Sequence, residues 1–285
     1  MHPKKWIGIV LIAVSFLSTA AAQSNEIVIN KVAGEKEQLI IDILSLVLSK
    51  TDSQARIRQY SESLPQPRLM DEIKSGNIDL MWVGEDLSLE PELKPIRIPL
   101  LKGLLGHRIF IIKKGQQARF NNVKTLDDLK QLNAGQGTDW GDTQILKKTG
   151  IPTITTLKFK NLFRMLEGER FDYFPRAVHE PWPEVNYWPE LNLTVEKKIM
   201  LVYPYAMYFY VKKDNQMLYD KLSQGFETAI ADGSFDALFF NNQLIKDALT
   251  KTNIKNRTVI KIANPTMHPD TPIDRKALWL DTANL

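Results

Sequence analysis

Cysteine is absent from this sequence of 285 residues. Its absence excludes disulfide bonds, thiol nucleophiles and cysteine-ligated metal sites, and it excludes a lipid anchor on a cysteine at the start of a mature chain. The sequence also has no nucleophile elbow, no phosphate-binding P-loop and no His-Glu-x-x-His zinc motif. We therefore expect neither a metal ion nor a cofactor.

Long hydrophobic runs are scarce as well, and the one that stands out lies at the amino terminus, at residues 6–17. Lys4 and Lys5 precede it, and three consecutive alanines ending at Ala22 supply the small residues that a signal peptidase requires. The run is shorter than the roughly 20 residues of a membrane-spanning helix. These features predict a signal peptide over residues 1–22, cleaved after Ala22, and a soluble periplasmic mature protein.

An excess of charge of one sign is also missing. The formal charge of +4 falls to +2 when Lys4 and Lys5 leave with the signal peptide, and the other basic residues are scattered among acidic ones. This pattern excludes a basic stripe for nucleic acid. A mature chain of this length buries one large core or two modest ones, and the pattern along it favours two.

Strand and helix patterns alternate from Glu26 onward. We expect strands at residues 27–32, 55–60 and 78–83, and helices at 37–49 and 68–74. This βαβ alternation predicts a parallel sheet flanked by helices. Trp82 and Glu85 fall at the carboxyl end of the third strand, where open α/β sheets place their ligands. Trp82 is equally consistent with a core residue, because buried tryptophan is common.

A second α/β unit follows the strand that begins at His107. Its stretch GQGTDWGDTQIL is a glycine-rich turn that leads into a helix, so Thr138 and Trp140 lie where free backbone N–H groups can bind an anion or a carboxylate. Alternatively, Asp139 and Asp142 cap the helix themselves. The turn is therefore a candidate binding site with a structural alternative.

The stretch GERFDYFPRAVHE predicts a turn, a strand at residues 171–174 and a polar loop that carries Arg176, His179 and Glu180. The chain returns near residues 202–208. Together with the segment near His107, this return makes two crossings between two sheets. The arrangement predicts a bilobed α/β protein with a cleft.

Four phrases resemble one known family. They are SGNIDL, TLDDLKQLNAGQGT, MLEGERFDYFP and DNQMLYDKLSQGFETAIADGSFDALFF, and they occur in the order seen in the family 3 extracellular solute-binding proteins, the periplasmic amino-acid-binding type. The resemblance covers residues 26–249. It implies a type II periplasmic-binding-protein fold with two hinge crossings, ligand capture by hinge closure, and delivery to an inner-membrane ABC permease.

The resemblance also implies a division of the chain. Residues 23–108 and 207–285 are expected to form the first lobe, and residues 109–206 the second. Residues 246–285 extend beyond the usual end of the family, and we expect this extension to wrap back over a lobe with Trp279 as its anchor. We expect a monomer.

The departures from the family concern the ligand clamp. Typical amino-acid binders carry an Arg after the first-lobe ligand strand, where this chain has Glu92 and Leu93, and an Asp after the second-lobe strand, where this chain has Arg176. We therefore expect a small polar or anionic, amino-acid-like metabolite whose negative group meets Arg176. In the first lobe, Arg97 or Arg108 could take the place of the missing clamp arginine. Arg108 is also consistent with a structural hinge residue.

The expected ligand-binding residues lie in both lobes: Trp82, Glu85, Arg108, Thr138, Trp140, Arg176 and Glu180. Two other functions stay open. A sensory binding protein would present its ligand to a membrane receptor, and a dehydratase-like periplasmic enzyme would use His179 and Glu180 as acid and base with Glu85 opposite. Because catalytic motifs are missing, binding without catalysis is favoured.

Overall fold

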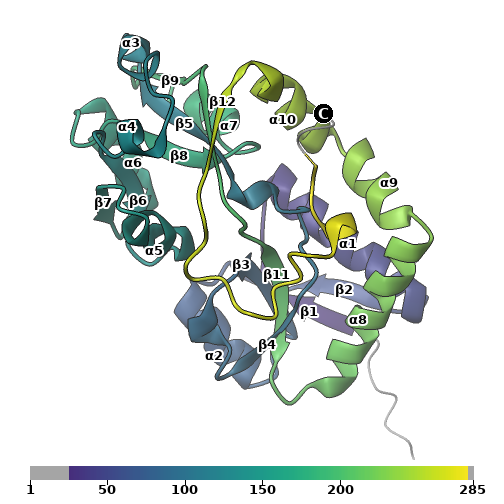
Figure 1. Cartoon of the computed structure of the whole chain (residues 1–285). Helices are drawn as coiled ribbons and strands as arrows, with labels where there is room; N and C mark the ends of the chain where they lie inside the picture. The colour runs from purple at the N-terminus through teal and green to yellow at the C-terminus, as the bar shows by residue number, and fades with distance from the viewer. Residues whose placement is uncertain (1–25, 282–285) are drawn as a thin grey trace, which may run out of the picture.

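The computed structural model describes residues 26–281, so the expected signal peptide and its cleavage site lie outside the described residues. Two mixed sheets, each covered by helices, make up most of the molecule (Figure 1). Within the described range, no helix is long and apolar enough to cross a membrane.

The first sheet has the strand order β2-β1-β3-β11-β4, with β1, β2 and β3 parallel and β11 antiparallel to both of its neighbours. Its strands are β1 (Glu26–Ile29), β2 (Arg56–Gln59), β3 (Leu80–Gly84), β4 (Leu93–Ile96) and β11 (Met207–Lys212). The helices that accompany them are α1 (Glu35–Thr51), α2 (Gln66–Lys74), α8 (Gln216–Ala231) and α9 (Ser234–Asn241). The predicted βαβ pattern is confirmed here.

Helices α1 and α8 approach closely on this sheet. A Cβ atom at Gly225 of α8 would overlap the carbonyl oxygen of Val47 in α1. Glycine at this position therefore lets the two backbones touch. The apolar stripe of α8, which includes Leu218, Leu222 and Phe226, is buried as the four-residue spacing predicts.

The second sheet has the order β12-β10-β5-β8, and β9 also pairs with β5. Its strands are β5 (His107–Lys113), β8 (Phe174–Ala177), β9 (Leu193–Val195), β10 (Ile199–Val202) and β12 (Thr258–Lys261), and β6 (Ala134–Gly137) pairs with β7 (Thr153–Thr156) beside it. The helices are α3 (Gln117–Phe120), α4 (Leu126–Leu129), α5 (Gly141–Lys148), α6 (Phe159–Glu167), α7 (Pro181–Tyr187) and α10 (Gln243–Thr252). Short 3₁₀ turns lie at Leu87–Leu89 (η1), Leu104–Gly106 (η2), Ile254–Asn256 (η3) and Lys276–Leu278 (η4).

The strand expected at residues 171–174 lies three residues later. Residues 174–177 form β8 because they pair with β5, opposite residues 108–111. The shift moves Arg176 from a predicted loop into a strand. It also places Arg176 directly opposite Ile109, next to Arg108.

The chain passes between the two sheets at residues 97–106, from β4 to β5, and at residues 203–206, from β10 to β11. One apolar core cluster continues through these connections, since it contains Ile29 of the first sheet, Leu104 of the connection and Phe110 of the second sheet. That these connections act as hinges stays a prediction.

The carboxy-terminal extension differs from the expectation that it belongs with the first lobe. Its strand β12 pairs in parallel with β10 at the edge of the second sheet, with Ile199 opposite Thr258 and Val202 opposite Lys261. The edge of β10 was open for pairing, and a strand edge is stabilised when it is paired. The extension therefore visits the second sheet first and then returns to the first. The other lobe boundaries stay a prediction.

Candidate functional site

A cavity of about 310 Å³ lies between the two sheets and is lined from both of them. We call it the cleft. The first-sheet side contributes Lys36, Glu37, Trp82, Gly84 and Asp86, the second-sheet side contributes Arg108, Asp139, Trp140, Gly141, Asp142, Arg176 and Glu180, and Tyr205 comes from a connection. Of the predicted site residues, five therefore meet in the cleft: Trp82, Arg108, Trp140, Arg176 and Glu180.

The first-sheet wall is built around the indole of Trp82, which projects from β3. Its Nε1 donates a hydrogen bond of 2.7 Å to a carboxylate oxygen of Glu37, in the first turn of α1. The ammonium of Lys36 lies 2.8 Å from the other oxygen of that carboxylate. Trp82 is thus a half-buried cleft residue, and its ring edge also contacts Phe209.

Lys36 and Glu37 were not predicted as site residues. They lie after the first strand, in the first turn of α1. The N-cap residue of this helix is Gly34, and no side chain caps the helix start. The first backbone N–H groups of such a helix are free to bind an acceptor. Their position after the carboxyl end of β1 could have predicted them, because open α/β sheets bind ligands at the carboxyl ends of their strands.

The second-sheet wall contains a buried charge network. Arg108 of β5 lies 2.9 Å from Asp142 and 3.7 Å from Glu180. The same Asp142 oxygen accepts hydrogen bonds from Gln136, at 3.1 Å, and from the Tyr203 hydroxyl, at 3.2 Å. Burial opposes the charge on Arg108, but the carboxylates outweigh it and raise the pKa of the guanidinium. Arg108 lies in the second sheet and not in the first lobe, where it was expected to act.

Arg176 joins the same network. Its guanidinium makes a two-point contact with Glu184 of α7, at 2.6 and 2.8 Å, and lies 3.1 Å from Glu180. It also lies over the rings of Trp140, at 5.1 Å, and Phe174, at 5.0 Å. We call Arg108, Arg176, Asp142, Glu180 and Glu184 the paired-arginine network. Its two cations are already matched by three carboxylates.

Glu180 and His179 occupy different electrostatic environments. Burial disfavours an ionised Glu180, but Arg176 and Arg108 outweigh it and lower the pKa of Glu180 to about 2. His179 is buried, and burial lowers its pKa to about 4. Neither ring nitrogen of His179 has a hydrogen-bond partner among the described residues. At neutral pH Glu180 is therefore ionised and His179 is neutral.

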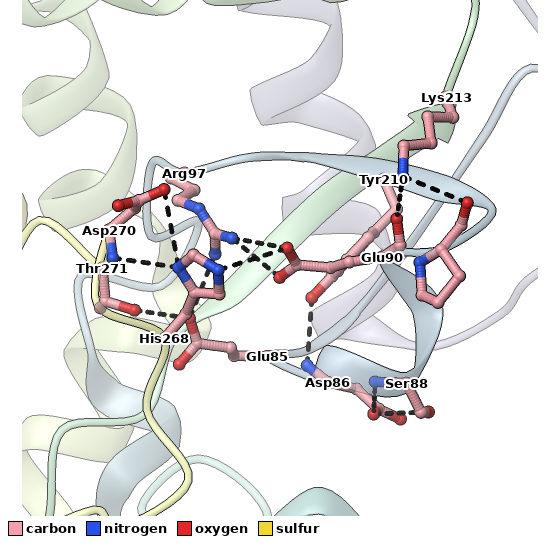
Figure 2. Close-up of polar contacts among 11 residues, drawn as sticks. Glu85, Asp86, Ser88, Glu90, Arg97, Tyr210, Lys213, His268, Asp270 and Thr271 are labelled. Atoms are coloured by element: carbon pink, nitrogen blue, oxygen red, sulfur yellow. Dashed lines mark hydrogen bonds and ion pairs between the residues drawn. The ribbon is translucent and has the colours of Figure 1, made fainter.

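Glu85 is not among the residues that line the cleft, and its side chain points toward Thr271 of the carboxy-terminal extension (Figure 2). Its carboxylate accepts a hydrogen bond of 2.5 Å from Thr271 in the extension and lies 3.4 Å from Arg97. Arg97 makes its shorter contacts, 2.7 and 2.8 Å, with Glu90. Burial raises the pKa of Glu85. The structure therefore places Glu85 in contact with the extension, and Arg97 in contact with Glu85 and Glu90.

The glycine-rich turn before α5 is split between two cavities. Thr138 lines a neighbouring cavity of about 590 Å³ instead of the cleft, and its backbone N–H is bonded to Thr156. The alternative interpretation, in which Asp139 or Asp142 caps the helix, is wrong, because α5 begins without a side-chain cap and Asp142 faces Arg108. Trp140, in contrast, lines the cleft.

Two glycines face the same hydroxyl group, one from each wall. Gly84 ends β3, Gly141 begins α5, and a Cβ atom at either residue would overlap or crowd the hydroxyl of Tyr205. The hydroxyl therefore lies between the walls. Across residues 26–281, no group of three or more metal-ligating side chains is assembled.

No protein-family model and no curated protein sequence matches the chain. Solved structures do match. An ancestral arginine-binding protein bound to arginine aligns with a TM-score of 0.52 and 16% identity, over 77% of this chain and 98% of its own. An amino acid ABC transporter substrate-binding protein from Streptococcus pneumoniae, bound to L-arginine, aligns with a TM-score of 0.52 and 14% identity, over 79% and 96%.

A third similar structure is an ancestral amino-acid-binding protein described as a precursor of cyclohexadienyl dehydratase, with a TM-score of 0.51 and 14% identity over 76% of this chain and 95% of its own. At these identities the similarity concerns the fold. It confirms the predicted α/β periplasmic-binding-protein fold of type II.

Proposed function

We propose that this protein is a periplasmic solute-binding protein that holds a small polar, amino-acid-like ligand between two lobes and passes it to an inner-membrane ABC permease. The observation that carries the proposal is the cleft, which aromatic and charged side chains line from both sheets. Concave sites of this kind between lobes are where small ligands bind. Proteins of the same fold that bind arginine or glutamine support the ligand class.

The charges of the cleft refine the ligand class. The second-wall arginines are already paired, so Lys36 and the open start of α1 are the donors that remain for a ligand carboxylate. Carboxylates outnumber cations along the lining: Glu37, Asp86, Asp139, Asp142 and Glu180 against Lys36, Arg108 and Arg176. We therefore favour a zwitterionic or cationic ligand over a purely anionic one.

Binding without catalysis is the better supported alternative. An acid–base pair works best when its pKa values lie near the operating pH. The pKa of His179 is lowered to about 4 and that of Glu180 to about 2, and Glu85 is bound to Thr271 outside the cleft. The three groups of the dehydratase-like hypothesis are therefore poorly placed for proton transfer at neutral pH.

A thermal-shift screen of the protein without residues 1–22 tests the proposal. Amino acids, including arginine and glutamine, are compared with dicarboxylic acids and sugars. A ligand at 100 times its Kd stabilises by about 2.7 kcal/mol. Absence of a stabilising amino-acid-like compound, or turnover of a bound one, would contradict the proposal.

Export and hinge closure have separate tests. Mass spectrometry of the periplasmic fraction should find a chain that begins after Ala22, and a membrane-bound full-length product would contradict cleavage. With the ligand found in the screen, small-angle scattering should show a monomer whose radius of gyration falls on binding, since closure around a ligand compacts two lobes. An unchanged radius at saturation would contradict closure.

A further inference from the structure

After β11 the chain passes between the two sheets twice more: through α8, α9 and α10 to β12, and then back to the first sheet through the carboxy-terminal segment. After β12 its path is fixed by Ile262, whose N–H donates to the carbonyl of Val202, and by Asn264, whose side chain donates to the carbonyl of Pro204. The segment then runs down to the first sheet (Figure 1). It therefore follows the connection between β10 and β11 from one sheet to the other.

The first sheet holds this segment at Thr271. The Thr271 hydroxyl donates to the buried carboxylate of Glu85, and the ring of His268 lies 3.7 Å from Glu90 (Figure 2). Four residues further on, Arg275 makes a two-point contact with Glu227 of α8, at 2.6 Å for each bond. These contacts tie the segment to the end of β3 and to a helix.

A further anchor lies at the end of the described chain. The N–H of Leu280 donates to the carbonyl of Lys102, and the ammonium of Lys102 donates to the carbonyl of Ala277 at 2.6 Å. The ring of Trp279 lies against Gly103, where a Cβ atom would come within 2.5 Å of it. Trp279 is thus the anchor that the sequence predicted.

At the other end, the second sheet holds the segment through β12 and the buried side chain of Arg257. This guanidinium donates to the carbonyls of Thr252, at 2.7 Å, and Ile199, at 2.9 Å, and lies 3.4 Å from Glu196. Both ends are therefore bound to folded structure by several contacts.

Between its anchors the segment is short and stiff. The nine residues that lead from Ile262 to Thr271 can span at most about 30 Å. Pro265 and Pro269 fix their own φ angles, and each lies in a turn closed by a backbone hydrogen bond, from Met267 to Asn264 and from Thr271 to His268. Beside these contacts, a cavity of about 600 Å³ is lined by Tyr203 and Pro204 of the connection and by Ile273, Lys276 and Trp279 of the segment, so the segment is not packed against the connection along its whole length.

We propose that residues 262–280 form a strap that limits how far the two lobes separate, so that the cleft opens by a smaller angle than the other connections between the sheets would permit. The strap also acts on the cleft itself, because Glu85 lies between Gly84 and Asp86, which both line it. This proposal rests on the proposed function in one respect, which is that the cleft is taken as the ligand site. Its test needs no ligand.

Distances between two spin labels test the strap in the unliganded protein. The native chain has no cysteine, so the pair Ser88→Cys and Gln144→Cys labels two positions that face the same cavity from opposite lobes. We expect a single narrow distance distribution. A control pair, Ser88→Cys and Asp71→Cys, lies within the first lobe and should be unaffected by every strap variant.

Two sets of strap variants are compared. Thr271→Val with Arg275→Ala removes first-lobe anchors, and we expect the mean interlobe distance to lengthen by more than about 2 Å and the distribution to broaden. Pro265→Gly with Pro269→Gly keeps every anchor but loosens the strap, and we expect broadening alone. Thr271→Ser with Arg275→Lys is the matched control and should retain the native distribution.

Circular dichroism and urea unfolding establish that each variant is folded. If the anchor variant is unfolded, the proline variant decides, since it leaves the anchors in place. Unchanged interlobe distributions in a folded variant of either set would overturn the strap. A broad distribution in the native chain would overturn it too. A failed ligand screen would leave these distances untouched, so the two proposals fail separately.

Discussion

The two walls of the cleft use charge in different ways. On the second-sheet wall, Arg108 and Arg176 are only 3% and 9% exposed and are bonded to carboxylates of their own lobe. On the first-sheet wall, Lys36 and Glu37 are 32% and 20% exposed and contact one another at the open start of a helix. Burial makes the second wall costly to disturb, because an unpaired buried charge is strongly destabilising. We propose that the second wall is mainly structural and that the first wall offers its groups to a ligand.

The largest expected effect follows from breaking the paired-arginine network. Arg176→Ala leaves Glu180 and Glu184 buried without their shared cation, and we expect a loss of about 3–5 kcal/mol in the free energy of unfolding. Urea denaturation measures it. The control is Arg164→Ala, on the exposed face of α6, which should change stability by less than about 0.5 kcal/mol. A loss below 1 kcal/mol for Arg176→Ala would contradict the structural role of the second wall.

The next effect is the pH dependence that His179 gives to the same wall. The unfolded-state pKa of histidine is about 6.5, whereas burial lowers the pKa of His179 to about 4. Below pH 6.5 the unfolded chain binds a proton that the folded chain rejects, so stability falls as the pH drops from 6.5 to 4. The difference between the two pKa values corresponds to a loss of about 3 kcal/mol in the free energy of unfolding.

His179→Met should remove most of this acid sensitivity without loss of stability at pH 7, because neither ring nitrogen has a partner in the described part of the chain. Unfolding free energies at pH 7 and pH 5 measure it. Part of the acid sensitivity should remain in the variant, because burial also lowers the pKa of His107. Glu180, whose pKa is lowered, contributes to the pH dependence of stability only at more acidic pH. If the unfolding free energy falls equally between pH 7 and pH 5 in the variant and in the native chain, His179 is charged or exposed.

A smaller effect is expected on the first wall. Trp82→Phe keeps the ring but removes the indole N–H that bonds to Glu37, and we expect a loss of about 1 kcal/mol in stability. Glu37→Gln is the control, since its amide oxygen still accepts that bond. Thermal unfolding compares the two. If both variants are as stable as the native chain, the bond between Trp82 and Glu37 does not hold this wall in place.

The smallest effect on stability is expected for Lys36→Met. A half-exposed ion pair contributes at most about 1 kcal/mol, and the apolar part of the side chain is preserved. Affinity should respond instead, because Lys36 is the cation of the cleft that no buried carboxylate holds. Calorimetry with the ligand found in the screen should show about tenfold weaker binding, which is 1.4 kcal/mol. Unchanged affinity would mean that the ligand carboxylate lies elsewhere.

Sequence patterns predicted the parts of the fold that depend on local signals. The first three strands, the helices between them and the β11–α8–α9 ending were found from alternation, four-residue spacing and glycine stops. Within the extension, β12 was assigned to the wrong sheet, because it pairs with a strand almost 60 residues earlier and no local signal specifies that partner. Long-range pairing of short edge strands is not encoded in the pattern of either strand.

The site shows the same boundary between local and distant causes. Trp82 and Trp140 reached the cleft because strand ends and helix starts meet there. Glu85 did not, because Thr271, 186 positions away, holds its carboxylate on the other side. Arg176 reached the cleft, but its guanidinium is bonded to Glu184, which lies eight positions later in α7. Residue type and position predicted where a side chain lies and could not predict which partner it has.

The contact of Gly84, Tyr205 and Gly141 has a consequence for the geometry of closure. One phenol oxygen acts as a spacer of fixed thickness between a strand end and a helix start, and both surfaces that touch it are bare backbone. Because neither glycine has a methyl group, both backbones can lie against this oxygen. A single added carbon at either glycine would collide with this hydroxyl, and we expect it to keep the two walls further apart. The closure that we propose would therefore depend on the absence of a side chain at these two positions.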